Sequence, residues 1–145
     1  MPEISSHLAS CLCGMVKIKS KLTEHNIHVC HCNMCRRWAG GPNFAVDCGN
    51  DIQITGEENI SIYNSSDWAE RGFCKLCGSH LFYRLKGNNR YMLPAGLFEK
   101  LENMKLSHQF FIDEKPDYYT FADASTNLTG AEVFAMFAAS PIKPD

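Results

Sequence analysis

The stretch CHCNMC at residues 30–35 places three cysteines within six residues of the chain. Two shorter stretches share this character: CLCG at residues 11–14 and CKLCG at residues 74–78. Thiols one or two residues apart can reach one ion without straining the backbone, and zinc binds thiolates in tetrahedral arrays. A glycine follows both shorter stretches and permits the positive φ that a turn around an ion often needs. The three stretches therefore predict metal binding.

The number of clustered cysteines indicates how the ions are shared. Seven of the eight cysteines lie in the three stretches. A structural zinc takes four protein ligands, whereas a catalytic zinc keeps three and leaves one position open. The simplest division puts the two glycine-followed stretches in a closed site and leaves the central stretch as an open one. The closed site then has Cys11, Cys13, Cys74 and Cys77, and the open site has Cys30, Cys32 and Cys35.

The sequence leaves two alternatives to this division open. In the first, Cys32 and Cys35 join the pair at residues 74–77. In the second, the central site is closed by a fourth ligand, for which the candidates are Cys48, His31, His108 or another histidine. A single cysteine in a strand is more often a small buried residue than a ligand, which is our expectation for Cys48. The ring of His31, held between two ligands, is expected to point away from their ion.

Two arginines directly follow the central stretch. Three thiolates on a divalent ion leave a net negative charge, which a neighbouring cation balances. Arg36 and Arg37 are therefore candidates for this role or for binding the carboxylates of a ligand, since guanidinium groups suit bidentate contacts. His108 is a third candidate, for substrate contact or proton transfer. Each of the three is equally compatible with an ordinary surface or structural role.

The bulk composition is that of an ordinary globular chain. With 145 residues, 45% of them hydrophobic and 21% charged, the sequence excludes the disordered and collagen-like classes, and we expect one domain over residues 1–145. The net charge of −2 gives no reason to expect nucleic acid or a membrane as a partner. Residues 1–10 lack the basic and apolar regions of a secretory signal. We therefore expect a cytoplasmic protein with reduced thiols.

Apolar alternation and β-branched or aromatic residues predict a mostly antiparallel β architecture. Segments of strand character recur, many with turn residues between them: residues 14–20, 43–48, 52–55, 60–64, 80–85, 90–93 and 108–112. Two short helices are expected, one at residues 33–39 and one that begins near Thr129 and is stopped by Pro141. The apolar residues 133–137 of the second helix are expected to pack in the core, as are Trp38 and Trp68.

The cysteine order resembles the family of glutathione-dependent formaldehyde-activating enzymes, also called centromere protein V-type domains. The residues that carry the likeness are SCLCG at 10–14, CHCNMCR at 30–36 and RGFCKLCGS at 71–79, with a weaker echo at 108–112 and 115–119. The likeness spans about residues 10–119. Residues 120–145 are then a C-terminal extension.

The resemblance implies a mainly β fold of packed antiparallel sheets, called a β-tent and similar to the Mss4-like fold, with short helices and two zinc ions per chain. It implies that the first and last cysteine pairs hold a structural zinc and that Cys30, Cys32 and Cys35 hold a catalytic zinc. The family's namesake activity is that of a carbon–sulfur lyase, which joins glutathione to formaldehyde as S-hydroxymethylglutathione. The implied partners are a small thiol, glutathione or a relative, and an aldehyde.

Two other functions compete with a lyase. One is a non-catalytic zinc module that binds a protein or chromatin, although the acidic balance and the lack of a long basic tail argue against nucleic acid. The other is a redox protein of the methionine sulfoxide reductase kind, which also carries zinc cysteines on a β fold. That kind pairs two CxxC groups with a separate reactive cysteine, a role for which only Cys48 remains here.

Overall fold

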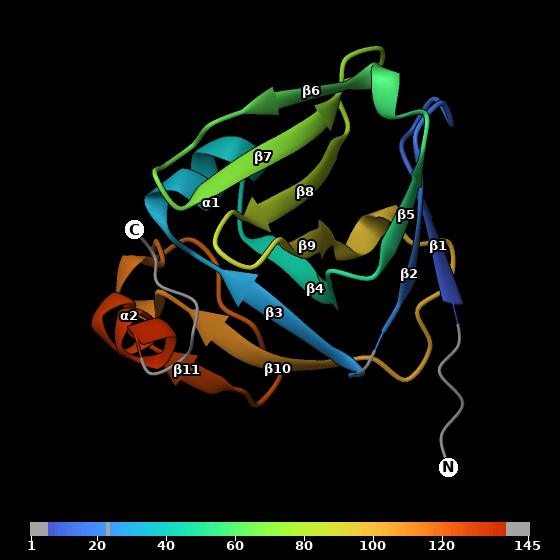
Figure 1. Cartoon of the computed structure of the whole chain (residues 1–145). Helices are drawn as coiled ribbons and strands as arrows, with labels where there is room; N and C mark the ends of the chain where they lie inside the picture. Colours follow the sequence, from blue (N-terminus) through green and yellow to red (C-terminus); the bar gives the residue numbers. More distant parts are fainter. Residues whose placement is uncertain (1–5, 23, 139–145) are drawn as a thin grey trace.

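The computed structural model describes residues 6–22 and 24–138. In these residues two β-sheets are joined by turns and short 3₁₀ segments, and two short α-helices accompany them. Figure 1 shows the smaller sheet at the right of the molecule and both helices at its left. The helices therefore lie at the side of the larger sheet that is remote from the smaller one.

The smaller sheet has the strand order β1–β2–β5, with antiparallel pairs. Its strands are β1 (Ser6–Ser10), β2 (Lys17–Lys21) and β5 (Ile52–Thr55). Along β2, exposed lysines alternate with the buried side chains of Ile18 and Ser20. This alternation of period two is expected for a strand with one face on the core.

The larger sheet has the strand order β11–β10–β3–β4–β9–β8–β7–β6. Its strands are β3 (Asn26–Cys30), β4 (Asn43–Gly49), β6 (Ile60–Tyr63), β7 (Ala69–Cys74), β8 (His80–Leu85), β9 (Arg90–Pro94), β10 (Lys105–Phe110) and β11 (Thr126–Leu128). In this spatial order, all neighbouring strands from β3 through β4, β9, β8 and β7 to β6 pair in the antiparallel direction. In contrast, β10 runs parallel to both of its neighbours, β3 and β11.

The helices and 3₁₀ segments lie at strand ends. They are α1 (Asn33–Ala39), α2 (Gly130–Ala138), η1 (Glu57–Asn59), η2 (Ala95–Leu97) and η3 (Ile112–Glu114). Helix α1 begins after Cys32, whose sulfur accepts the N–H of Cys35, and ends at Gly40 with a left-handed φ of 83°. Glycine adopts that conformation without a steric cost, so the sequence itself ends the helix there.

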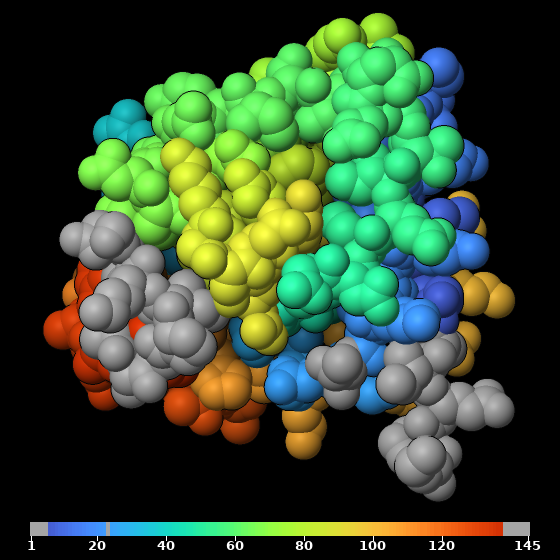
Figure 2. Space-filling view, viewed as in Figure 1, coloured from blue at the N-terminus to red at the C-terminus, as the bar shows by residue number. Residues whose placement is uncertain are grey.

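The main core lies between the two sheets. Ile18 of β2 and Val16 of the turn before it contribute to this core from the smaller sheet. The larger sheet contributes Val46, Leu81 and Leu93, and all five side chains are buried. Burial of each such side chain contributes roughly 1.5–3 kcal/mol to the stability of the fold. Figure 2 shows the outer face of the same region, with the β8–β9 hairpin in yellow beside the green segment that carries β5.

The mainly β class with short helices is confirmed. The seven expected strands correspond to β2, β4, β5, β6, β8, β9 and β10, and both expected helices are present. Pro141, the expected stop of the second helix, lies outside the described residues. The sequence does not predict β1, β3, β7 or β11. The expectation of mostly antiparallel pairing is also confirmed, with β10 as the exception, since it pairs in parallel with β3 and β11.

Candidate metal centres and the adjoining cavity

The first cysteine group joins the turn after β1 to the turn after β7. The sulfurs of Cys11, Cys13, Cys74 and Cys77 all lie within 4.8 Å of one another. The Cys11 and Cys13 sulfurs are 3.6 Å apart, and those of Cys13 and Cys74 are 3.8 Å apart. Four sulfurs at about 2.3 Å from one ion in a tetrahedron lie roughly 3.8 Å from each other. The donor set and its spacing therefore fit a closed zinc site.

Polar groups around this cysteine group favour the thiolate forms of Cys11 and Cys77. The N–H of Val16 donates to the Cys11 sulfur over 3.3 Å, and the Ser79 hydroxyl lies 3.2 Å from the Cys77 sulfur. The same hydroxyl accepts the N–H of Leu12 over 3.0 Å, which ties the two turns together. Hydrogen bonds from the side chain and the N–H of Ser79 lower the pKa of Cys77 to about 5. Thiolates are the form that binds metal.

The second cysteine group comes from a single segment of the chain. Cys30 is the last residue of β3, Cys32 caps α1 and Cys35 lies in the helix, and their sulfurs are within 4.8 Å of one another. The N–H of Cys35 donates to the Cys32 sulfur over 3.3 Å. Among residues 6–22 and 24–138, no fourth His, Cys, Asp or Glu ligand atom joins this group. Three thiolates suit zinc or another soft metal ion and leave one coordination position for a ligand.

A buried arginine from β7 supplies positive charge to this second group. Arg71 is 3% exposed, and its Nη2 lies 3.6 Å from the Cys35 sulfur. Its guanidinium group is held over the rings of Tyr83 and Trp38, at 4.9 and 5.8 Å from their centroids. Hydrogen bonds from the thiols of Cys30 and Cys32, and then the charge of Arg71, lower the pKa of Cys35 to about 3. The chain thus carries its own counter-charge for a thiolate cluster.

His31 lies between two of these cysteines in the sequence, but both of its ring nitrogens form hydrogen bonds with other residues. Its ring is buried, with Nε2 2.8 Å from Oε1 of Gln109 and Nδ1 2.7 Å from the Tyr119 hydroxyl. Because an amide oxygen only accepts, Nε2 carries the proton and Nδ1 accepts from Tyr119. Both nitrogens are therefore occupied, and His31 is no fourth ligand. The expectation that its ring points away from the cysteines is confirmed.

The other two candidates for a fourth ligand also lie apart from the group. Cys48 is 2% exposed in the main core, where its thiol donates to the carbonyl of Val46 over 3.6 Å. Burial raises the pKa of Cys48 to about 11, which fits the expected small buried residue. His108 pairs through Nδ1 with the Ser107 hydroxyl over 2.8 Å.

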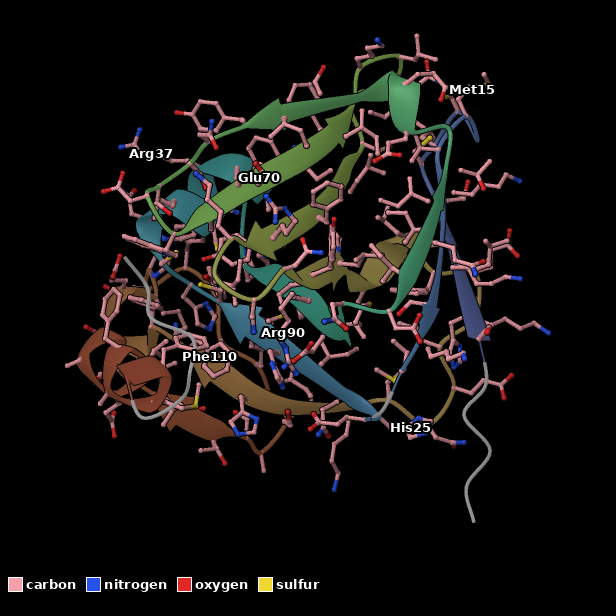
Figure 3. All side chains as sticks on the ribbon, in the orientation of Figure 1. Met15, His25, Arg37, Glu70, Arg90 and Phe110 are labelled. Atoms are coloured by element: carbon pink, nitrogen blue, oxygen red, sulfur yellow. The ribbon has the colours of Figure 1, made fainter. Side chains whose placement is uncertain are left out.

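A cavity of about 390 Å³ opens beside the second group. All three of its cysteines line this cavity, and so does Arg71. Six aromatic side chains form much of the remaining wall: Trp68, Tyr83, Phe110, Phe111, Phe134 and Phe137. Figure 3 shows Phe110 at the end of β10, beside α2. The three thiols therefore line a partly open cavity whose wall is largely apolar.

The structure does not bring the three predicted substrate residues to this cavity. Arg36 donates through Nε to the His31 carbonyl over 2.9 Å, and Arg37 donates to Oδ1 of Asn33 over 2.9 Å. Figure 3 shows Arg37 at the outer surface, and neither arginine nor His108 is part of the cavity wall. The wall instead contains Arg71 and Glu114, for which the sequence gives no separate signal.

Comparisons with known proteins find one matching family and several similar proteins. The sequence profile of the family described as Glutathione-dependent formaldehyde-activating enzyme matches residues 6–114. An uncharacterized lyase of Schizosaccharomyces pombe is 38% identical over 134 residues, which cover 92% of this chain and 96% of that protein. A Halomonas elongata protein, provisionally named as a glutathione-dependent formaldehyde-activating enzyme, is 32% identical over 82 residues, 50% of this chain and 52% of that protein.

A crystal structure of a Rhodobacter sphaeroides protein has a similar fold. The TM-score is 0.57 and the identity 24%, over 66% of this chain and 91% of that one. In the described part of the chain, neither helix is long and apolar enough to cross a membrane. With the profile match covering most of its length and a relative aligned almost end to end, the chain belongs to the family of glutathione-dependent formaldehyde-activating enzymes.

Proposed function

We propose that the chain is a zinc-dependent carbon–sulfur lyase that acts on the adduct of a thiol and an aldehyde. The reference reaction is the formation and cleavage of S-hydroxymethylglutathione from glutathione and formaldehyde. The observation that carries the proposal is an incomplete set of ligands in the wall of a cavity, with no fourth protein ligand among the described residues. Family membership and the lyase name of the Schizosaccharomyces pombe relative support it.

Each cysteine group has its own role in this proposal. Cys11, Cys13, Cys74 and Cys77 hold a structural zinc, and Cys30, Cys32 and Cys35 hold a catalytic zinc. When bound, the catalytic ion supplies an open coordination position and stabilises the sulfur of a substrate as a thiolate at neutral pH. We place the chain in a reducing compartment such as the cytoplasm, where cysteines stay available to bind metal.

The reaction needs neither an oxidant nor a reductant. In the cleavage direction, the hydroxyl proton of the adduct leaves and its electron pair forms the C=O bond of the aldehyde. The carbon–sulfur bond breaks, and its electron pair departs with sulfur as a thiolate. Addition reverses these changes. The cavity holds the reacting sulfur and the aldehyde carbon beside each other, which replaces a bimolecular encounter with an oriented one.

We assign Glu114 as the general base that accepts the hydroxyl proton of the adduct. Glu114 lines the cavity from an exposed position, and its Oε1 accepts the N–H of Asn33 over 3.0 Å. This contact fixes the carboxylate and leaves Oε2 to accept the proton. Arg71 balances the charge of the three thiolates.

Arg36, Arg37 and His108 stay candidates for the part of a substrate that extends out of the cavity. Glutathione carries two carboxylates, and Arg71, the one arginine that the described residues place in the cavity wall, is already engaged with Cys35 and two rings. The carboxylates therefore need cations outside the cavity. Arg37 is exposed on α1, the helix that carries Cys35, and suits that role.

The experiment is a rate measurement on purified, zinc-loaded protein. We expect it to accelerate the formation of the glutathione–formaldehyde adduct beyond the spontaneous rate, and Cys32→Ser to abolish the gain and lower the metal content from two ions per chain to one. The matched control is Cys48→Ala, which removes a cysteine outside both groups and should keep the activity and both ions. A folded, fully metal-loaded protein that accelerates no reaction of a small thiol with an aldehyde contradicts the proposal and favours the non-catalytic zinc module.

A further inference from the structure

The cavity is far larger and more apolar than a formaldehyde adduct requires. Its volume of about 390 Å³ falls in the roughly 300–1,000 Å³ range of pockets that hold drug-sized ligands. The hydroxymethyl group that formaldehyde adds to sulfur has only one carbon and one oxygen. It would leave most of the aromatic wall without a contact, and glutathione, with its charged ends, does not match that wall.

Helix α2 forms one side of the cavity, although it lies beyond the profile match that ends at residue 114. Val133 of α2 is 2% exposed, and the Phe134 ring packs edge-on against Phe111 and Trp68, with centroid distances of 5.7 and 6.4 Å. The part of the chain outside the family profile therefore shapes the space next to the three thiols.

The start of α2 is fixed in place by hydrogen bonds. The N–H of Thr129 donates to Oε1 of Glu132 over 2.9 Å, and the Glu132 N–H donates to the Thr129 hydroxyl over 3.2 Å. This reciprocal pair is a capping box. The N–H of Gly130 also donates to Oδ1 of Asp113 over 2.8 Å. The contact between Gly130 and Asp113 anchors α2 to the turn that follows β10.

Phe111 shows that this junction is tightly built. Its φ of 57° is left-handed, a conformation that a bulky side chain rarely adopts. A Cβ atom placed on Gly130 would lie 2.8 Å from the Phe111 ring, so only glycine lets the ring and the helix approach this closely. Strained backbone of this kind is concentrated where a site must hold a side chain in one position. Here it holds an aromatic ring between α2 and the cavity.

We propose that the cavity binds an apolar group on the aldehyde-derived carbon, so that the substrates are thiol adducts of aromatic or medium-chain aldehydes, and that Phe134 of α2 sets the accepted size. This inference rests on the proposed lyase function and deepens it. The bonds that form and break are those already described, because the added apolar group takes no part in them.

Binding of stable thioethers tests the inference without any turnover. S-methylglutathione and S-benzylglutathione share the same tripeptide, and calorimetry on the zinc-loaded protein compares their affinities. We expect the benzyl compound to bind at least about tenfold more tightly, since even one well-placed methylene in an apolar pocket is worth roughly that factor. In Phe134→Trp, which fills the cavity, this ratio should fall at least about tenfold.

The control variant is Met136→Trp. Met136 lies on the same helix, is 42% exposed against 43% for Phe134, and is not part of the cavity wall. It should keep the wild-type ratio. Equal affinities of the two thioethers overturn the inference, and so does an equal effect of the two variants.

Turnover separates this inference from the proposed function. We expect kcat/KM for the glutathione adducts of benzaldehyde and hexanal to exceed that for the formaldehyde adduct by at least about tenfold. Turnover of all three adducts at the same efficiency supports the lyase and overturns the apolar substrate class. Tight binding of the benzyl thioether without turnover of any adduct supports the apolar pocket and overturns the lyase.

Discussion

The two cysteine groups have the same kind of ligand but differ in their surroundings, since one lies at the surface and the other beside an apolar cavity. The group of four lies between surface turns whose tips, Leu12 and Leu76, are 88% and 58% exposed. Its ligands come from segments 61 residues apart, as the contact of Cys13 with Cys74 shows. The group of three comes from one short segment and faces an apolar cavity beside the buried Arg71.

This difference separates stability from chemistry within one small chain. A closed set of ligands that joins distant segments acts as a cross-link, because a bound ion holds the two turns together in the folded state only. An incomplete set next to a cavity contributes less to folding, since its ligands are already held by β3 and α1. We therefore expect the closed group to stabilise the folded chain and the open group to take part in the reaction.

The largest effect is expected from Cys74→Ser. Cys74 is fully buried, and structural zinc contributes on the order of 10 kcal/mol of apparent binding free energy, comparable with the roughly 5–15 kcal/mol stability of a whole domain. We expect the variant to lose its structure, measured by circular dichroism together with metal content. Cys35→Ser is the matched change in the other group and should remain folded with one ion. Unfolding of both variants to the same extent would remove the distinction between the groups.

A large loss of rate without a loss of structure is expected from Glu114→Gln. General base catalysis contributes typically about 10²–10⁴-fold, and an amide cannot take the hydroxyl proton. We expect kcat to fall by roughly that factor while both ions and the melting temperature are kept. Asp113→Asn is the neighbouring control and should keep the wild-type kcat, since the amide oxygen of Asn can still accept the Gly130 N–H. A kcat close to that of the wild type in Glu114→Gln would show that another group or water takes the proton.

A smaller and more local effect is expected from Arg71→Met. The three thiolates lose their counter-charge, and loss of a group that supports metal ligands typically weakens metal binding by about 10–100-fold. Without Arg71 the pKa of Cys35 rises, so half-saturation with zinc should move to higher pH. Competition with a chelator measures both changes, and only the group of three should respond. Arg37→Met, on the exposed side of α1, should leave both affinities unchanged, and an equal change in the two variants would argue against charge balance by Arg71.

The grouping of the sulfurs could be predicted because ligand spacing is a local property. Two cysteines one or two residues apart can share an ion whatever the rest of the chain does. The mainly β class followed in the same way from the alternation in segments such as β5 and β8, whose bounds agree with the expected ones.

The cavity could not be predicted because its wall is assembled from distant elements. Arg71 reaches the group of three only through the register of β7 with β8, in which it pairs with Tyr83. The sequence of β7 gives little strand signal, since it contains Arg71 and Gly72. Gly72 is needed there because the Phe82 ring lies 2.4 Å from the position of a Cβ atom. Tertiary packing, which no local pattern records, decides such positions.

The smallest effect is expected from His80, a residue near the group of three, and concerns how the folding stability depends on pH. His80 stacks on Trp38 of α1 with a centroid distance of 4.4 Å, and burial, followed by the charge of Arg71, lowers its pKa. In the unfolded chain the pKa is about 6.5. As pH falls below that value the unfolded state binds more protons than the folded one, so folding stability decreases.

His80→Gln removes this proton difference and should make the loss of stability between about pH 6.5 and 5 shallower than in the wild type. Urea unfolding at several pH values measures it, with metal analysis to confirm that both ions are retained at each point. Parallel curves for the two proteins would mean that His80 does not couple proton binding to folding. A shallower curve, by contrast, would show that the burial of His80 against Trp38 couples proton binding to folding next to α1, the helix that carries Cys35.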